Sequence, residues 1–189
     1  MATMETLEKL LQEHREAARL MDLLEEQARS GENGDLALIC DIMHYMTHYP
    51  DLFHHRREDA VLRALALKRP DATPWLGRVE REHAQLADAG RALMELLRSP
   101  GLDDQGRRQI CRQALDYTGL LRAHMSYEER ELFPAARAWL DAPDWEEIDR
   151  ALPCPPDPLS GMGASPRYQV LEKQYRSRLA WLIDGDRAD

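Results

Sequence analysis

The chain has 189 residues, of which 43% are hydrophobic and 31% charged, and its formal net charge is −9. This length suffices for one domain with a buried core, and the acidic balance argues against a nucleic-acid-binding protein, whose surface should be basic. No apolar run approaches the ~20 residues that span a bilayer, and neither the N-terminus nor the three sparse cysteines indicate export, so we expect a cytoplasmic protein that does not bind membranes.

Apolar residues recur at helical spacing along most of the chain and nowhere alternate convincingly, which predicts an all-α fold. The first helix ends at the Ser-Gly-Glu-Asn-Gly sequence of residues 30–34. The second runs from about Asp35 to about Leu67. Pro50 should kink or restart it, because proline removes a backbone donor and clashes with the preceding turn.

The third helix begins with Thr73 as N-cap and Pro74 as its first residue, and it ends near Ser99. The fourth runs from about Asp103 to about Leu140. The four apolar stripes can be buried only against one another, and the connections between them are short. This pattern favours an up-down-up-down four-helix bundle.

We assign the bundle to residues 1–142 and a helical extension to residues 143–189. The Asp-Trp-Glu-Glu sequence that starts at Asp144 indicates a capping box and a short helix to about Leu152. An irregular proline-rich linker follows it, and the last predicted helix covers roughly residues 167–183. That helix could pack on its own bundle or on a neighbour's, so a homodimer formed through it is possible.

Histidines and glutamates interrupt the apolar stripes on their inward side. Each of the four bundle helices carries an inward histidine, and the second and fourth add a glutamate four residues later, on the same face and about 6 Å along the axis. Such a set gives four nitrogens and two carboxylates able to bridge two cations, with positions left for exchangeable ligands. Zinc fits less well because a structural zinc ion is usually bound by four protein ligands and would not need six. The predicted metal ligands are His14, His54, Glu58, His83, His124 and Glu128.

The remaining histidines are weaker candidates. His55 lies a quarter-turn from His54, so only one of the two can face the core, and His54 is in phase with Glu58. We therefore expect His55 to be exposed or to contact the ligands from outside. His44 and His48 precede the proline break and are expected at the rim, although one of them could replace His54.

Four stretches resemble the hemerythrin-like family, also called the HHE cation-binding domain family. The resemblance implies a non-haem centre of two iron ions, bridged by carboxylate and by oxo or hydroxo groups, with histidine nitrogens as the other ligands; manganese or zinc could replace iron. Oxygen-carrying hemerythrins have a second histidine one turn after the first on the third helix, where this chain has Ala87. A four-histidine set is similar to the iron-sensing and nitrosative-stress members. The stretches that carry the resemblance are residues 12–15, 49–59, 82–86 and 124–134.

Three functions fit these observations. The favoured one is a di-iron protein that binds or senses oxygen, nitric oxide or iron in oxidative or nitrosative stress or in iron handling. The alternative is an enzyme that reduces peroxide or nitric oxide, or donates iron for iron–sulfur repair. We assign no catalytic residue, and only Cys154 in the linker could help an electron route, since no flavin, haem or nucleotide motif is present. The third is a metal-stabilised module whose last helix recruits a partner.

Overall fold

The computed structural model describes residues 5–152 and Lys173, and every regular element in that part of the chain is helical, as predicted. Two π-helical turns, Pro50–His54 and Glu128–Leu132, interrupt the long helices. None of the described helices combines the length and the apolarity that crossing a bilayer requires. The α-helices are α1 (Glu5–Arg29), α2 (Leu36–Met46), α3 (His55–Lys68), α4 (Thr73–Leu97), α5 (Asp104–Tyr127), α6 (Phe133–Trp139) and α7 (Ala142–Ala151).

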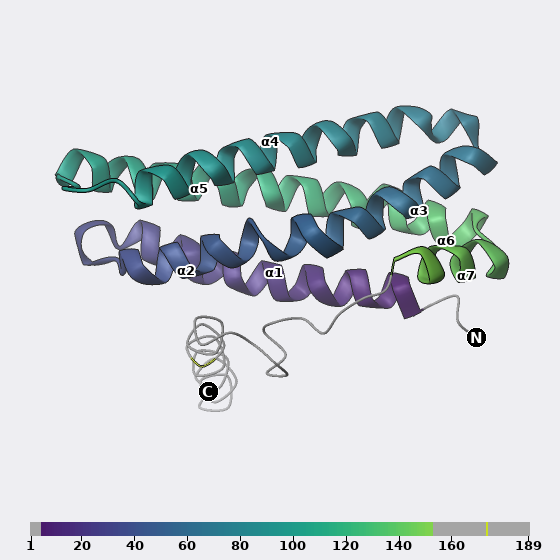
Figure 1. Cartoon of the computed structure of the whole chain (residues 1–189), viewed down its shortest axis with the longest axis horizontal. Helices are drawn as coiled ribbons and strands as arrows, with labels where there is room; N and C mark the ends of the chain where they lie inside the picture. Colours follow the sequence, from purple (N-terminus) through teal and green to yellow (C-terminus); the bar gives the residue numbers. More distant parts are fainter. Residues whose placement is uncertain (1–4, 153–172, 174–189) are drawn as a thin grey trace, which may run out of the picture.

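The long helices lie side by side in a bundle, with α2 and α3 following one another along a single line (Figure 1). Helix α1 packs against α5 and α2, and α4 packs against α5, α3 and α2. Each helix therefore has neighbours on two sides and shares one interior with them. The short helices α6 and α7 lie at one end of the bundle, in contact with α3 (Figure 1).

The hydrophobic core of the described residues has two parts, with a polar layer between them. On α1, Leu10 belongs to one part and Leu20 to the other, and the buried His14 lies between them. On α4, Val79 and Leu86 flank His83 in the same way. The sequence thus builds a bundle whose apolar halves enclose a band of histidines and carboxylates.

The helix ends agree with the sequence only in part. The predicted start of the fourth helix near Asp103 is confirmed, and Asp103 caps α5, since its side chain accepts from the backbone N–H of Gly106 at 2.8 Å. The prediction that Thr73 is the N-cap of α4 was wrong. A 3-10 turn, Pro70–Ala72, runs directly into the helix, so Thr73 already has helical torsion angles and Ala72 takes the cap position.

Helix α7 starts earlier than predicted and joins the bundle. Its capping box pairs Asp141 with Asp144, three residues before the box that the sequence suggested. Trp145 and Ile148 are buried in the same apolar cluster as Val61. The predicted domain boundary after residue 142 therefore falls in the first turn of a helix that packs on the bundle. The linker with Cys154, the last predicted helix and the proposed dimer contact lie outside the described residues.

Gly90 marks a close approach between α4 and the end of α2. A Cβ atom added there would lie 2.6 Å from Cγ2 of Thr47, whereas one added at Gly119, on the exposed side of α5, would meet nothing within 4 Å. Overpacking costs about 1–3 kcal/mol and glycine in a helix costs about 1 kcal/mol relative to alanine. We expect Gly90→Ala to lower the free energy of unfolding by up to about 2 kcal/mol and Gly119→Ala to raise it by about 0.5–1 kcal/mol, as measured by urea denaturation. Equal shifts in the two variants would contradict the close approach.

Candidate metal centre

Each His-x-x-x-Glu pair of the sequence touches one of the π turns. His54 is the last residue of the first turn, and Glu128 is the first residue of the second. Pro50 begins the first turn and Pro134 follows the second; since proline has no backbone N–H, each removes a donor from the regular α-helical pattern. A π turn is wider than an α turn and re-aims the side chains beside it, which is why such turns recur at functional sites.

Glu58 lies at the centre of the polar layer and is almost completely buried. Its Oε1 atom is 2.7 Å from Nε2 of His54 and 3.1 Å from Nε2 of His14. Its Oε2 atom is 3.3 Å from Nε2 of His83. One carboxylate thus faces imidazole nitrogens from three different segments of the bundle.

Glu128 faces Glu58 from the other side of the layer and is fully buried. Its Oε2 atom is 3.4 Å from Nε2 of His14 and 3.4 Å from Nε2 of His124. The Nε2 atoms of His83 and His124 are 3.2 Å apart. The six ligands predicted from the sequence therefore converge on one small volume, with all four Nε2 atoms turned inward.

Three carboxylate oxygens in this volume make no hydrogen bond. They are Oε2 of Glu58 and both oxygens of Glu128, and all three are inaccessible to solvent. A buried polar atom without a hydrogen-bond partner costs roughly 1–3 kcal/mol of folding free energy. A cluster of such carboxylate oxygens therefore indicates a cation site. The donor set of imidazole nitrogens and carboxylate oxygens suits a first-row transition metal ion.

A second ring of carboxylates contacts the outer nitrogen of each of these histidines. When the Nδ1–H group of a metal-binding histidine donates to a carboxylate, the ring is fixed and the lone pair of Nε2 points at the metal. The sequence analysis did not identify these outer residues. The contacts of the Nδ1 atoms are His14 with Glu129 at 3.0 Å, His54 with Glu13 at 2.6 Å, His83 with Asp59 at 3.5 Å, and His124 with Glu82 at 3.0 Å.

Each outer carboxylate is next in sequence to one of the six predicted ligands. It contacts a different ligand, the histidine of the adjoining helix. Glu82 precedes His83 on α4 and holds His124 of α5. Glu129 in turn follows Glu128, after the end of α5, and holds His14 of α1. The same relation continues around the bundle, so each helix that supplies a ligand also orients the ligand of its neighbour.

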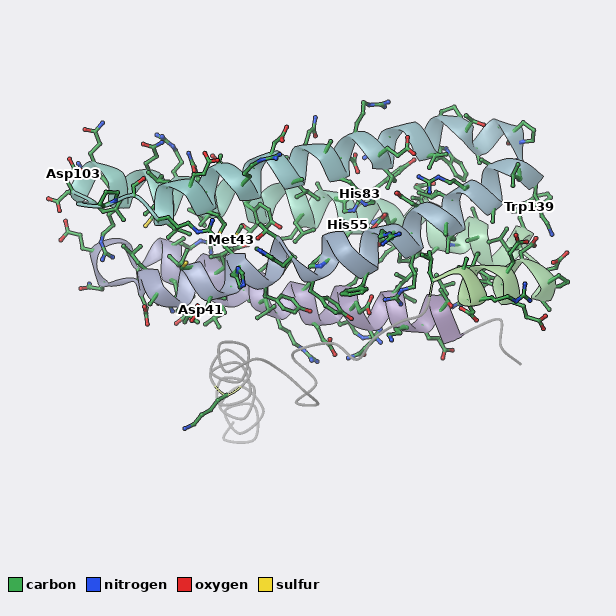
Figure 2. All side chains as sticks on the ribbon, in the orientation of Figure 1. Asp41, Met43, His55, His83, Asp103 and Trp139 are labelled. Carbon is green, nitrogen blue, oxygen red and sulfur yellow. The ribbon has the colours of Figure 1, made fainter. Side chains whose placement is uncertain are left out.

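The remaining histidines divide into two groups. His55 is half-buried and stacks on His83, with ring centroids 4.1 Å apart (Figure 2). The expectation that only one of His54 and His55 faces the core was wrong, because the π turn that ends at His54 changes the angle between them. The contact of His55 with His83 agrees with the expectation that His55 contacts a ligand from outside. His44 and His48 contact each other through their rings, at 4.0 Å, and do not belong to the described groups whose ligand atoms come together.

The sequence matches the family model of the hemerythrin HHE cation-binding domain over residues 5–136. The chain belongs to this family. Among curated proteins, none matches the sequence significantly. The matched residues contain all six convergent side chains, and the chain is accordingly a helical protein with the residues of a cation-binding centre.

The two central carboxyl groups of this HHE domain differ in proton affinity when no cation is bound. Burial alone would raise the pKa of Glu58, but contacts with His54, His14 and His83 hold it well below its usual value. Burial and the neighbouring negative charge of Glu58 raise the pKa of Glu128 to about 8. At neutral pH Glu58 is therefore ionised, whereas Glu128 retains a proton.

Three of the histidines in the HHE domain bind protons tightly in the metal-free chain. Although burial lowers their affinity, the carboxylates around them raise the pKa of His14 and His83 to about 10 and that of His54 to about 9. His124 behaves differently. Burial, together with the charge of His83, lowers its pKa to about 4, so its imidazole is neutral and ready to coordinate at neutral pH.

A small cavity of about 30 Å³ adjoins the centre. His14, His54, His55 and His124 line it together with Glu13. The rest of its lining is mainly apolar and aromatic, contributed by Ala17, Tyr45, Met46, Tyr49, Leu121 and Met125. The cavity has room for about one water-sized molecule.

Proposed function

We propose that this HHE domain holds two iron ions and uses them to bind or sense a diatomic ligand, oxygen or nitric oxide, in stress response or iron handling. The observation that carries the proposal is the pair of buried carboxylates, Glu58 and Glu128, whose three unbonded oxygens lie among four inward-facing Nε2 atoms. Carboxylates bridge paired cations and offset their mutual repulsion. The proposed ligands are the six residues predicted from the sequence, in a bundle of up-down-up-down order.

Charge supports two ions over one. Six carboxylates surround the histidines in the two rings, and three arginines (Arg57, Arg63 and Arg78) contact the outer ones. With neutral imidazoles, the described side chains of the centre therefore carry six negative charges against three positive ones. A single divalent cation leaves one negative charge uncompensated, whereas two divalent cations joined by a hydroxide bridge leave none, and buried uncompensated charge is costly.

The cavity supports a small ligand next to the proposed ions. A volume of about 30 Å³ is enough for at least one water-sized molecule, and oxygen and nitric oxide are of comparable size. Its apolar lining residues, which include Met46, Leu121 and Met125, favour an uncharged ligand. Its polar lining residues include three of the proposed ligands, His14, His54 and His124, so a molecule in the cavity lies next to the ions.

The proposal is tested by metal analysis and absorption spectroscopy of protein purified without oxygen and then exposed to air. We expect about two irons per chain and a near-ultraviolet charge-transfer band that appears with air. Nitric oxide added to the reduced protein should give a different visible spectrum. One zinc per chain, or an intact fold without metal, would overturn the redox proposal, while two manganese ions would retain the centre and change the metal.

Loading of the metal should release several protons per chain at pH 7. His14, His54 and His83 carry protons at that pH, and a histidine must be neutral to coordinate through Nε2. The apparent affinity of the chain for metal should therefore continue to rise between pH 7 and pH 9. In a site whose histidines have ordinary pKa values near 6.5, the affinity no longer changes in this pH range. Titration with cobalt(II) in weakly buffered solution measures both effects. A flat affinity above pH 7 would contradict the raised pKa values.

A further inference from the structure

His55 is placed with the proposed ligands although the helical period of the sequence turns it away. It is the first residue of α3 and directly follows the π turn Pro50–His54. In a regular α-helix consecutive side chains point about 100° apart. The wider π turn reduces that angle, so His54 and His55 can face the same interior from successive positions.

Two ring contacts hold His55 against the centre. It lies beside His83 (Figure 2) and stacks on it almost parallel, at 4.1 Å and 20°. It also meets His124 edge-on at 6.1 Å. His55 also lines the small cavity. Its ring therefore contacts histidines from both α4 and α5.

The ligand atoms of the centre fall into two groups that share one carboxylate. Within each group, one nitrogen or oxygen atom of every residue lies within 4.8 Å of the others. The first group contains His14, His54 and Glu58, and the second contains His55, Glu58, His83 and His124. The described residues thus offer two nitrogens on one side of Glu58 and three on the other.

We propose that His55 is a fifth nitrogen ligand, bound to the ion that His83 and His124 hold. The inference rests on the dinuclear centre proposed above. His55, at the start of α3, would then supply a ligand to the ion that lies beside α4. On α4 itself, the residue one turn after His83 is Ala87, whose side chain has no ligand atom. The two ions are then unequal, with three nitrogens on one and two on the other.

This inequality predicts where a small ligand binds. Ions of this class favour six ligands. The ion held by His14 and His54 would have fewer protein ligands than the ion held by His55, His83 and His124, so it would be the one able to take a small ligand. The cavity is lined by His14 and His54 as well as by His55 and His124, so it adjoins both proposed ion positions.

The test counts ligated imidazoles in the intact chain loaded with cobalt(II). Each bound histidine keeps one exchangeable ring N–H proton, and its proton NMR resonance is shifted far outside the normal range by the paramagnetic ion. We expect five such resonances in the wild type and four in His55→Ala and His55→Asn. The matched control is His48→Asn, which removes a nearby exposed histidine and should keep all five.

Affinity gives a second readout that does not depend on activity. Loss of a group that merely orients a ligand costs about 10–100-fold in metal affinity, so we expect loss of a ligand to weaken the second cobalt(II) by at least tenfold. Free imidazole should restore binding in His55→Ala, because the vacated space adjoins the cavity. Four shifted resonances in the wild type, or unchanged affinity in both variants, would overturn the assignment of His55. A wild type that binds fewer than two ions would instead reject the dinuclear centre itself.

Discussion

Glu128→Gln should abolish binding of the metal pair without lowering the stability of the metal-free chain at pH 6. The raised pKa of Glu128, about 8, means that its carboxyl group is protonated in the folded chain at pH 6, and glutamine has nearly the same shape. We expect the free energy of unfolding of the metal-free variant to be equal to or higher than that of the wild type at pH 6, because the wild-type carboxyl group ionises at this pH when the chain unfolds. Metal affinity should fall by more than about 100-fold, because a neutral amide cannot bridge two cations.

The pH dependence of this variant has a defined sign. A carboxyl group whose pKa is raised in the folded state contributes stability that is complete below its unfolded value of 4.5 and is lost as pH rises through about 8. Glutamine cannot ionise, so metal-free Glu128→Gln should be more stable than the wild type at pH 9. Urea denaturation at pH 6 and pH 9, with metal removed by chelation, measures the difference.

Glu58→Gln is the matched control. It should also lose the metal, but it should destabilise the metal-free chain already at pH 6, because ionised Glu58 compensates the protonated His14 and His54. The two variants therefore agree in metal content and differ in stability. Identical stability profiles in Glu58→Gln and Glu128→Gln would contradict the unequal proton affinities of the two carboxyl groups.

The sequence contained enough to predict the helices and to bring six side chains together. His14 and His83 lie in phase with apolar residues of α1 and α4, and helical geometry places Glu58 and Glu128 one turn from their histidines. The helical spacing of apolar residues could not predict which side chains of different helices contact one another. Glu13, Asp59, Glu82 and Glu129 each act on a histidine of another segment, and a stripe pattern within one helix carries no information about its neighbours.

A signal for these outer carboxylates was nevertheless present. Each is adjacent in sequence to a proposed ligand, and an acidic residue beside an inward-facing one lies near the boundary with the next helix. The wrong prediction that His54 and His55 cannot both face the core has a different cause. That prediction assumed the α-helical angle between consecutive side chains at a place where Pro50 removes a backbone donor and a π turn forms. Proline close to a His-x-x-x-Glu pair could have warned against a strict period of 3.6 residues.

Glu13→Gln should produce the second large effect, because Glu13 serves the fold and the centre together. Its side chain accepts hydrogen bonds from Nδ1 of His54 at 2.6 Å and from Nη2 of Arg57 at 3.0 Å, and Arg57 is only 4% exposed. Removal of one partner from a buried ion pair costs about 3–5 kcal/mol, since the other charge stays in the interior without compensation. We expect Glu13→Gln to lower the free energy of unfolding by about that amount and to weaken metal binding about 10–100-fold.

Glu82→Gln separates the two roles. Glu82 holds His124 at 3.0 Å, but its own partner Arg78 is 45% exposed, so the loss of that pair should cost less than about 1 kcal/mol. Metal affinity should still fall about 10–100-fold, because the ring of His124 is no longer oriented. The matched control is Glu95→Gln, on the exposed side of α4, which should change neither quantity.

Urea denaturation of the metal-free proteins and competition with a chelator for cobalt(II) distinguish these outcomes. Equal metal affinities in Glu82→Gln and Glu95→Gln would mean that the outer carboxylate does not orient His124. Unchanged stability in Glu13→Gln would mean that the buried contact with Arg57 does not support the fold. If both expectations hold, the outer carboxylates act through the histidines of neighbouring helices, and packing of the bundle and affinity for metal are then properties of one connected set of side chains.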